Sequence, residues 1–213
     1  MGNIYKVVFK DIKKRLTTKF KDLNFLEETF PEGSLNLYFD VGYGEKFVIF
    51  FLPIDREFNP NLLIHFAPLE VFFESVRRFL EIKPPVGYRV RFFLSSGGFK
   101  NLLDHLEKLG RYRVLLVVNL EETGIGNEKI VINGLSGNIL YKIDKILNNQ
   151  GLSTRKINIK EENHLEDRIM STMQFRSIPN KYKNILPKDL YEVKRRDYIV
   201  LLIFLIITSV FKL

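Results

Sequence analysis

The 213-residue chain contains no cysteine, no tryptophan and only three histidines. The absence of cysteine excludes disulfide bonds, thiolate metal sites and a cysteine nucleophile, although it does not fix the cellular compartment. A hydrolytic zinc site needs about three ligands from His, Asp or Glu. His65, His105 and His164 each fit a partly buried or solvated side chain better than a metal ligand.

Targeting signals are also missing from the N-terminus. The stretch "MGNIYKVVFKDIKKRL" has no continuous apolar segment of the kind a secretory signal needs. Lys6 stands where the myristoylation pattern requires Ser or Thr. Apolar residues from Ile4 to Glu28 recur mostly at helical spacing. This segment is therefore either an amphipathic helix on a membrane or a helix packed on the domain, and the second interpretation is slightly favoured.

Basic residues exceed acidic ones, 33 to 25, which gives a net charge of +8. Such an excess is typical of proteins that bind phosphate backbones or anionic membranes. The densest basic groups, Lys10–Lys21 and Lys194–Arg196, lie at the two ends of the chain, and the second precedes an apolar run. The distribution favours a membrane lipid as partner and argues against direct nucleic-acid binding.

The apolar run from Tyr198 to Phe211 carries no charge and follows the cations Lys194–Arg196. As a helix it covers about 21 Å, which is short of the ~30 Å hydrocarbon core and requires snorkelling by Lys212 or a thin bilayer. A buried core strand or helix is the alternative. We predict a C-terminal transmembrane anchor at residues 198–212, and the positive-inside rule favours a cytosolic domain before it. The anchoring residues are Tyr198, Leu201, Leu202, Phe204, Ile207 and Phe211.

Strand-like and helix-like patterns alternate through the rest of the chain. They predict a β-hairpin from Leu35–Val41 and Lys46–Leu52, followed by helices, strands and short strands that alternate. The helices are expected at Leu69–Ile82, Phe99–Leu109, Ser136–Asn149 and Glu161–Met173, and the strands at Val90–Leu94, Val114–Leu120, "EKIVING" and "STRKINIK". This order predicts a three-layer α/β/α domain with a mainly parallel mixed sheet at residues 31–190, after a basic helical segment at 1–30.

Ligands of open α/β sheets bind at the carboxyl ends of the strands. The residues expected there are Asp55, Ser95–Gly98, Glu121 and Glu122. The "SSGG" turn lacks the G-x-S-x-G pattern of a serine nucleophile, and its glycines are better explained by a tight turn whose backbone N–H groups could hold an anion. Adjacent carboxylates on an extended chain point to opposite sides. No motif here specifies a reaction by itself.

The order of these elements resembles the M28 family of zinc aminopeptidases, and in detail its membrane-anchored, nicalin-like members. Nicalin-like proteins carry a Ser-Gly-Gly-Gly-Lys-Phe-Asn turn, similar to "SSGGFKN" at Ser95–Asn101, and a strand that ends in Leu-Asp-Thr-x-Gly, similar to "LEETG" at Leu120–Gly124. A late "SIPN" at Ser177–Asn180 fits the same order. The resemblance covers about Phe47 to Pro179.

The resemblance implies a catalytically degenerate site. The His-x-Asp metal motif falls on Pro53, Ile54 and Asp55, so only its aspartate remains. The other family positions fall on Leu63 for the bridging aspartate, Gly97 and Gly98 for the Glu-Glu pair with the catalytic base, Glu121 for a ligand aspartate, and Met170 for the last histidine. A site without its base and most ligands does not activate water. We therefore expect a protein that is not an enzyme and holds no cofactor.

The same resemblance implies a cellular role. Nicalin-like proteins are subunits of an endoplasmic reticulum membrane complex that associates with the translocon, near the ribosome, and assists biogenesis of multipass membrane proteins. A multispanning subunit and a nodal-modulator subunit are the implied partners. This chain is shorter than those proteins and has no evident signal peptide, so the sequence leaves open on which side of the membrane the domain lies.

Three alternatives remain. The chain is a tail-anchored α/β adaptor of another role, or a hydrolase with a rearranged metal site that uses Asp55, Glu121 and His164. The third is the related peptidase-like component of the GPI transamidase, which ranks lower because it requires several spanning segments.

Overall fold

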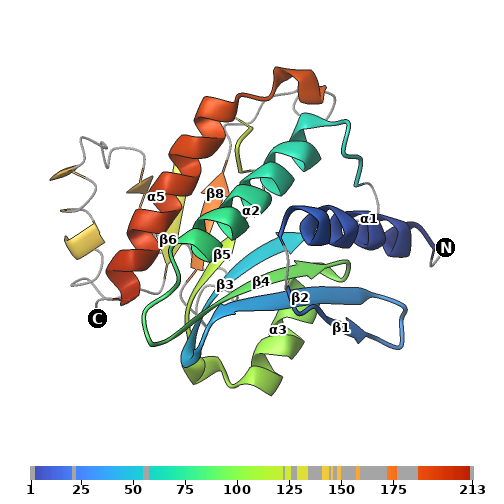
Figure 1. Ribbon diagram of the computed structural model, residues 1–213, viewed down its shortest axis with the longest axis horizontal. Helices are drawn as coiled ribbons and strands as arrows, with labels where there is room; N and C mark the ends of the chain where they lie inside the picture. The colour runs from blue at the N-terminus through green and yellow to red at the C-terminus, as the bar shows by residue number, and fades with distance from the viewer. Residues whose placement is uncertain are drawn as a thin grey trace.

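A computed structural model describes residues 3–20, 23–54, 58–121, 123–125, 129–133, 141–143, 145, 148–149, 157–158, 172–176 and 187–211. Three layers are visible in Figure 1. One face of a central sheet is covered by the helices α1 (Asn3–Lys19), α2 (Leu63–Glu81) and α5 (Val193–Phe211). The other face is covered by α3 (Gly98–Leu109). The predicted three-layer α/β/α architecture is therefore confirmed.

Eight strands form one mixed sheet in the order β1-β2-β4-β3-β5-β8-β6-β7. Strands β4, β3, β5 and β8 run parallel to one another, whereas β1, β2 and β6 join the sheet through antiparallel pairs. The strands are β1 (Leu26–Thr29), β2 (Leu35–Gly42), β3 (Gly44–Pro53), β4 (Gly87–Ser95), β5 (Val114–Asn119), β6 (Lys129–Asn133), β7 (Ile157–Asn158) and β8 (Thr172–Arg176). The described residues also contain short 3₁₀ helices at Arg111–Arg113 and Lys188–Leu190.

Phenylalanine rings fill the core between the sheet and its helices. The Phe92 ring lies within 4.9–6.3 Å of the rings of Phe39, Phe50, Phe72 and Phe79, measured between centroids. These rings come from three strands and one helix, so a single cluster ties β2, β3 and β4 to α2. Stacked and edge-to-face aromatic pairs each contribute about 0.5–1.5 kcal/mol beyond their area burial.

The predicted hairpin of β2 and β3 is wrong, because β4 lies between the two strands. Every residue of β4 from Val90 to Ser95 is buried, so this strand needs a neighbour on each side. It pairs with β2 in an antiparallel and with β3 in a parallel manner. The link between β2 and β3 passes the start of β4 at Gly44, where a Cβ atom would lie 2.0 Å from the carbonyl carbon of Gly87.

The N-terminal helix ends at Lys19 rather than near Glu28. Residues Leu26–Thr29 form the edge strand β1, in which Leu26 pairs with Tyr38 of β2. Phe9, Ile12 and Leu16 of α1 are buried in the core that also contains α2. The structure therefore supports the interpretation of this segment as a helix packed on the domain.

Helix α2 begins at Leu63, earlier than the predicted start at Leu69, and contains Pro68. Pro68 lies in the second turn of the helix, where it has no N–H to donate to the carbonyl of Ile64. Because of the early start, Ile64 and His65 belong to the helix and lie beside the end of β3.

Helix α3 and the strands β4 and β5 lie close to their predicted positions. The strands predicted in "EKIVING" and "STRKINIK" correspond to β6 and β7. The helix predicted at Ser136–Asn149 and most of that at Glu161–Met173 lie largely outside the described residues. The end of the latter prediction is wrong, because Thr172 and Met173 belong to β8 and pair with β5.

The transmembrane anchor predicted at Tyr198–Phe211 is also wrong, because α5 packs against α2 as part of the core (Figure 1). Of the six predicted anchoring residues, Leu202, Ile207 and Phe211 are buried, Phe204 packs 5.3 Å from the ring of Phe79, and Tyr198 and Leu201 are 42% exposed. The apolar run is about 21 Å long, too short for the bilayer core. Among the helices that the structure describes, none has the length and hydropathy to cross a membrane.

Substitutions on the two sides of α5 test this packing. Ile206→Ala removes a side chain that is 0% exposed, and we expect it to lower the free energy of unfolding by about 2–5 kcal/mol. Leu201→Ala, on the exposed side, should cost about 1 kcal/mol or less. Urea unfolding in detergent-free buffer measures both. Equal, small effects would show that α5 is not a core helix.

Candidate functional site

A cavity of about 120 Å³ lies where the parallel strands β3 and β5 end and α2 begins. Its lining residues are Leu52, Pro53, Phe58, Ile64, His65, Pro68 and Glu121. This is the edge of the sheet at which α/β proteins bind ligands. The cavity is therefore the candidate functional site of the domain.

His65 lies in the first turn of α2 and lines this cavity. Its Nδ1 accepts a hydrogen bond of 3.0 Å from the backbone N–H of Asn59, and its ring lies 5.2 Å from the ring of Phe58. With Nδ1 as acceptor, the neutral imidazole carries its proton on Nε2. We did not predict a role for His65, because the helix was expected to begin only after it. The stretch "NPNLL" could have indicated a helix that begins before His65.

Glu121 follows β5 and lines the same cavity. Its backbone N–H donates to Oδ1 of Asn119 at 3.0 Å. Pro53 also lines the cavity, whereas Leu63, at the predicted position of the bridging aspartate, is an apolar side chain in the core and only 3% exposed. The cavity thus combines one imidazole with one carboxylate.

A zinc site needs about three protein ligands. Within the residues that the structure describes, no group of three or more His, Asp or Glu side chains is placed to hold a metal ion. Asp55, His164 and Met170 lie outside the described residues.

Both serines of the "SSGG" turn serve the fold. The hydroxyl of Ser95 accepts a hydrogen bond of 3.2 Å from the backbone N–H of Gly97. The hydroxyl of Ser96 accepts one of 2.7 Å from the N–H of Leu35, and the N–H of Ser96 donates to the carbonyl of Leu35 at 2.9 Å. The two hydrogen bonds between Ser96 and Leu35 hold the turn against the start of β2.

Gly97 and Gly98 occupy the positions that the M28 resemblance assigns to the Glu-Glu pair. A Cβ atom on Gly97 would lie 2.2 Å from the side-chain amide of Asn101, which is buried and donates to Oγ of Ser34 at 2.9 Å. Gly98 has a φ of +61°, which disfavours residues with a side chain. Asn101 therefore fills the space that a carboxylate at position 97 would need.

A second polar cluster lies under α3 and is centred on His105, which is 3% exposed. Its Nε2 accepts a hydrogen bond of 2.6 Å from Arg91, so Nδ1 carries the proton and donates to Glu28 at 3.1 Å. Arg91 also donates to both carboxylate oxygens of Asp40, at 2.7 and 2.8 Å. These contacts join β1, β2 and β4 to α3, which indicates a structural role for His105.

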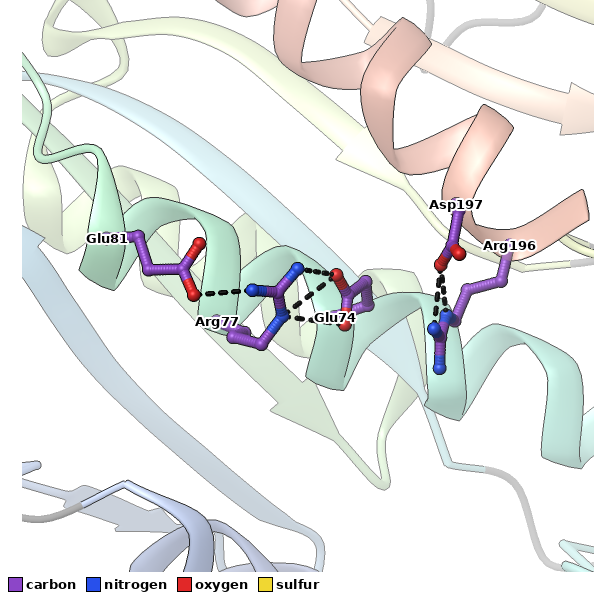
Figure 2. Close-up of polar contacts among 5 residues, drawn as sticks. All are labelled: Glu74, Arg77, Glu81, Arg196 and Asp197. Atoms are coloured by element: carbon purple, nitrogen blue, oxygen red, sulfur yellow. Dashed lines mark hydrogen bonds and ion pairs between the residues drawn. The ribbon is translucent and has the colours of Figure 1, made fainter. Parts of the chain in front are cut away.

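A larger cavity, of about 500 Å³, lies between α2 and α5 and contains paired charges. Figure 2 shows the Arg77 guanidinium between Glu74 and Glu81, and Arg196 bound to Asp197. Hydrogen bonds from Arg77 to Glu74 raise the pKa of Arg77. Arg77 and Arg196 thus have carboxylate partners, whereas the guanidinium of Arg78, which also lines this cavity, lies 5.2 Å from the centroid of the Phe204 ring.

The His105 cluster predicts a pH dependence of stability. Burial lowers the pKa of His105, Glu28 opposes this, and Arg91 and Lys108 lower it further. The unfolded chain, with a histidine pKa of about 6.5, then binds the proton more readily, so this stability is complete above about pH 6.5 and is lost as the pH falls below it. Urea unfolding at pH 7.5 and 5.5 should show a larger loss for the wild type than for His105→Gln.

Glu28 and Tyr38, two other titratable groups beside His105, keep their charge state between pH 7.5 and 5.5. The pKa of Glu28 lies below its usual value because burial, which raises it, is outweighed by the hydrogen bond from Asn36 and by His105. Glu28 therefore keeps its negative charge over this range. The phenol of Tyr38, whose ring lies against that of His105, has a pKa raised by burial and stays neutral in this range. Equal losses in both proteins would contradict the neutral, buried state of His105.

The Gly97 site predicts a coupled pair of substitutions. Gly97→Ala should lower the free energy of unfolding by about 1–3 kcal/mol, because its φ of −96° suits alanine but the methyl group overlaps Asn101. In an Asn101→Ala background the same change should be nearly neutral, which corresponds to a coupling of about 1 kcal/mol or more in a double-mutant cycle. If the two substitutions lowered the free energy of unfolding additively, Asn101 would not restrict the side chain at position 97.

Comparison with known proteins supports the fold. The glutaminyl cyclase of Fimbriiglobus ruber is 12% identical, with a TM-score of 0.65 over 98% of this chain and 88% of that one. A zinc aminopeptidase from Bacillus subtilis is 11% identical, with a TM-score of 0.62 over 82% of this chain but 50% of that one. A Zn-dependent exopeptidase from Parabacteroides distasonis is 12% identical, with a TM-score of 0.55 over 97% and 89%.

Sequence comparison adds no relative, since no protein-family model and no curated protein sequence matches the chain. The structural likeness, at these identities, concerns the fold. It confirms the fold part of the predicted resemblance: the chain has an M28 peptidase-like α/β fold.

Proposed function

We propose that this domain uses an M28-like scaffold for binding and does not hydrolyse peptide bonds. The observation that carries the proposal is Asn101, whose buried amide occupies the space of a side chain at Gly97. A metallopeptidase needs a carboxylate base beside its metal-bound water. Here the turn that follows β4 is built of Ser95, Ser96 and two glycines, and its hydroxyls hold the fold together.

The narrower proposal is a nicalin-like role. The order of "SSGGFKN" and "LEETG" after consecutive strands of an M28-like sheet supports it. In this role the chain is a non-catalytic subunit of an endoplasmic reticulum membrane complex near the translocon. It binds a multispanning membrane protein and a nodal-modulator-like subunit.

Co-purification tests the narrower proposal. The tagged chain is isolated from its native membranes in a gentle detergent, and the bound proteins are identified by mass spectrometry. We expect a multispanning protein and translocon subunits, in amounts comparable to the tagged chain. Isolation of the chain alone, or with partners unrelated to the translocon, would favour an adaptor of another role.

One observation favours a second candidate function, a hydrolase with a rearranged metal site. His65 and Glu121 line the same cavity at the carboxyl edge of the sheet. The alternative drawn from the sequence named Asp55, Glu121 and His164, of which Asp55 and His164 lie outside the described residues; His65 was not among its ligands. An imidazole and two carboxylates form a ligand set that catalytic zinc sites use.

Zinc content and turnover separate the two functions. Purified protein is incubated with Zn²⁺, dialysed and measured for bound metal, and then assayed with aminoacyl and N-terminal glutaminyl peptides. The binding proposal predicts no stoichiometric zinc and no turnover. Stoichiometric zinc with turnover that His65→Gln and Glu121→Gln both abolish would establish the hydrolase instead, since the lost ligands would remove the metal.

A further inference from the structure

The links that lead into the parallel strands β3, β4 and β5 meet at one edge of the sheet, the amino edge, where these strands begin. Gly44 at the start of β3 pairs with Gly87 at the start of β4. Phe47 of β3 pairs with Val114 at the start of β5. Figure 1 shows the three links close together at the lower end of the sheet. The candidate site lies where β3 and β5 end, and is therefore at the opposite edge.

Each of these links carries one large side chain that is mostly exposed. Tyr43 precedes β3 and is 86% exposed, Val86 precedes β4 and is 99% exposed, and Tyr112 precedes β5 and is 81% exposed. A single exposed apolar residue is ordinary in a folded protein. Three of them at the starts of neighbouring strands form a patch, and such patches mark interaction surfaces.

Backbone hydrogen bonds fix the first two links against each other. The N–H of Gly87 donates to the carbonyl of Tyr43 at 3.2 Å. The N–H of Tyr88 donates to the carbonyl of Pro85 at 3.1 Å, which closes a tight turn with Val86 at its tip. Because the backbone is already ordered, contact through these tips costs little conformational entropy.

Cations outnumber carboxylates among the residues that surround the patch. Lys46 donates to the carbonyl of Tyr112 at 3.5 Å, which joins the third link to β3. Neither Lys46 nor Lys83 pairs with a carboxylate in the part of the chain that the structure describes. Arg113 lies 3.8 Å from the exposed carboxylate of Glu45, and an exposed pair at that distance contributes little. The patch therefore suits an anionic partner.

We propose that the amino edge of the sheet rests on an anionic membrane surface. Val86 and the rings of Tyr43 and Tyr112 enter the headgroup region, where tyrosine keeps its hydroxyl in water and its ring in an apolar layer. Lys46 and Lys83 meet the lipid phosphates and carboxylates. Side chains that protrude this far insert readily into a deformable lipid layer, whereas a protein partner would need a matching hollow for each. Membrane contact here leaves the candidate cavity facing water and does not depend on what that cavity binds.

Co-sedimentation of the full chain with phosphatidylcholine vesicles, with and without phosphatidylserine, tests the proposal. We expect binding to the vesicles that contain phosphatidylserine, and this binding should weaken as salt is added. Binding to phosphatidylcholine alone should be at least about tenfold weaker, because the cations then lack anionic lipid to meet.

Matched variants locate the contact. Val86→Ser should weaken binding about three- to tenfold, whereas Val7→Ser, the same change at an exposed valine of α1, should leave it unchanged. Lys83→Gln should weaken binding about fivefold, and Lys14→Gln on α1 about twofold or less. All four residues are exposed, so circular dichroism and urea unfolding should show folded proteins.

An introduced tryptophan reports the contact directly, because the chain has none of its own. On addition of the anionic vesicles, the emission of Val86→Trp should shift to shorter wavelength, and brominated lipid should quench it. Val7→Trp should show neither change.

Three outcomes would overturn the proposal. The first is no binding to either kind of vesicle. The second is equal weakening by Val86→Ser and Val7→Ser, which would indicate diffuse attraction to the basic protein or contact through α1. The third is a dimer in lipid-free solution that Val86→Ser dissociates, which would assign the patch to a second copy of the chain.

Discussion

Strands β3 and β4 are buried on both faces, and the arrangement of the other elements follows from this constraint. From Phe47 to Leu52 every residue of β3 is buried, so alternate side chains must find an apolar layer on each side of the sheet. Helix α3 provides one layer, through Leu102 and Leu106. Helices α1, α2 and α5 provide the other. Helix α2 packs directly on the phenylalanine rings of the central strands, through Phe72 and Phe79.

The positions of the helices and strands could be predicted from the sequence better than the pairing of the strands. The periodicity of Phe99–Leu109 and the apolar run of Val114–Leu120 are local properties, and both elements lie where they were expected. Pairing is not local: β2 and β3 are separated by one residue, Tyr43, yet β4, which lies between them in the sheet, follows only after the intervening helix α2. Helix α5 shows a different limit, because Ile203 and Ile206 are as apolar in a protein core as they would be in lipid. Composition alone does not distinguish these two environments.

The candidate site was predicted in part for the same reason. Glu121 and Pro53 were assigned from strands that the sequence marks clearly, and both line the cavity. His65 was missed because its place depends on the start of α2, which an internal Pro68 obscures. The clash between Asn101 and a side chain at Gly97 could not be predicted, since it is a contact across a turn whose geometry depends on Leu35 of another strand. On the proposed binding role, such contacts are what separate an M28-like scaffold from an M28-like active site.

The central claim is that this scaffold lacks the metal chemistry of the zinc exopeptidases that share its fold. Diffraction from crystals grown with excess Zn²⁺, with data collected on both sides of the zinc absorption edge, tests this claim most directly. The account predicts no anomalous density in the cavity between His65 and Glu121. A fully occupied zinc ion bound to both side chains, together with a third ligand from the chain, would contradict it.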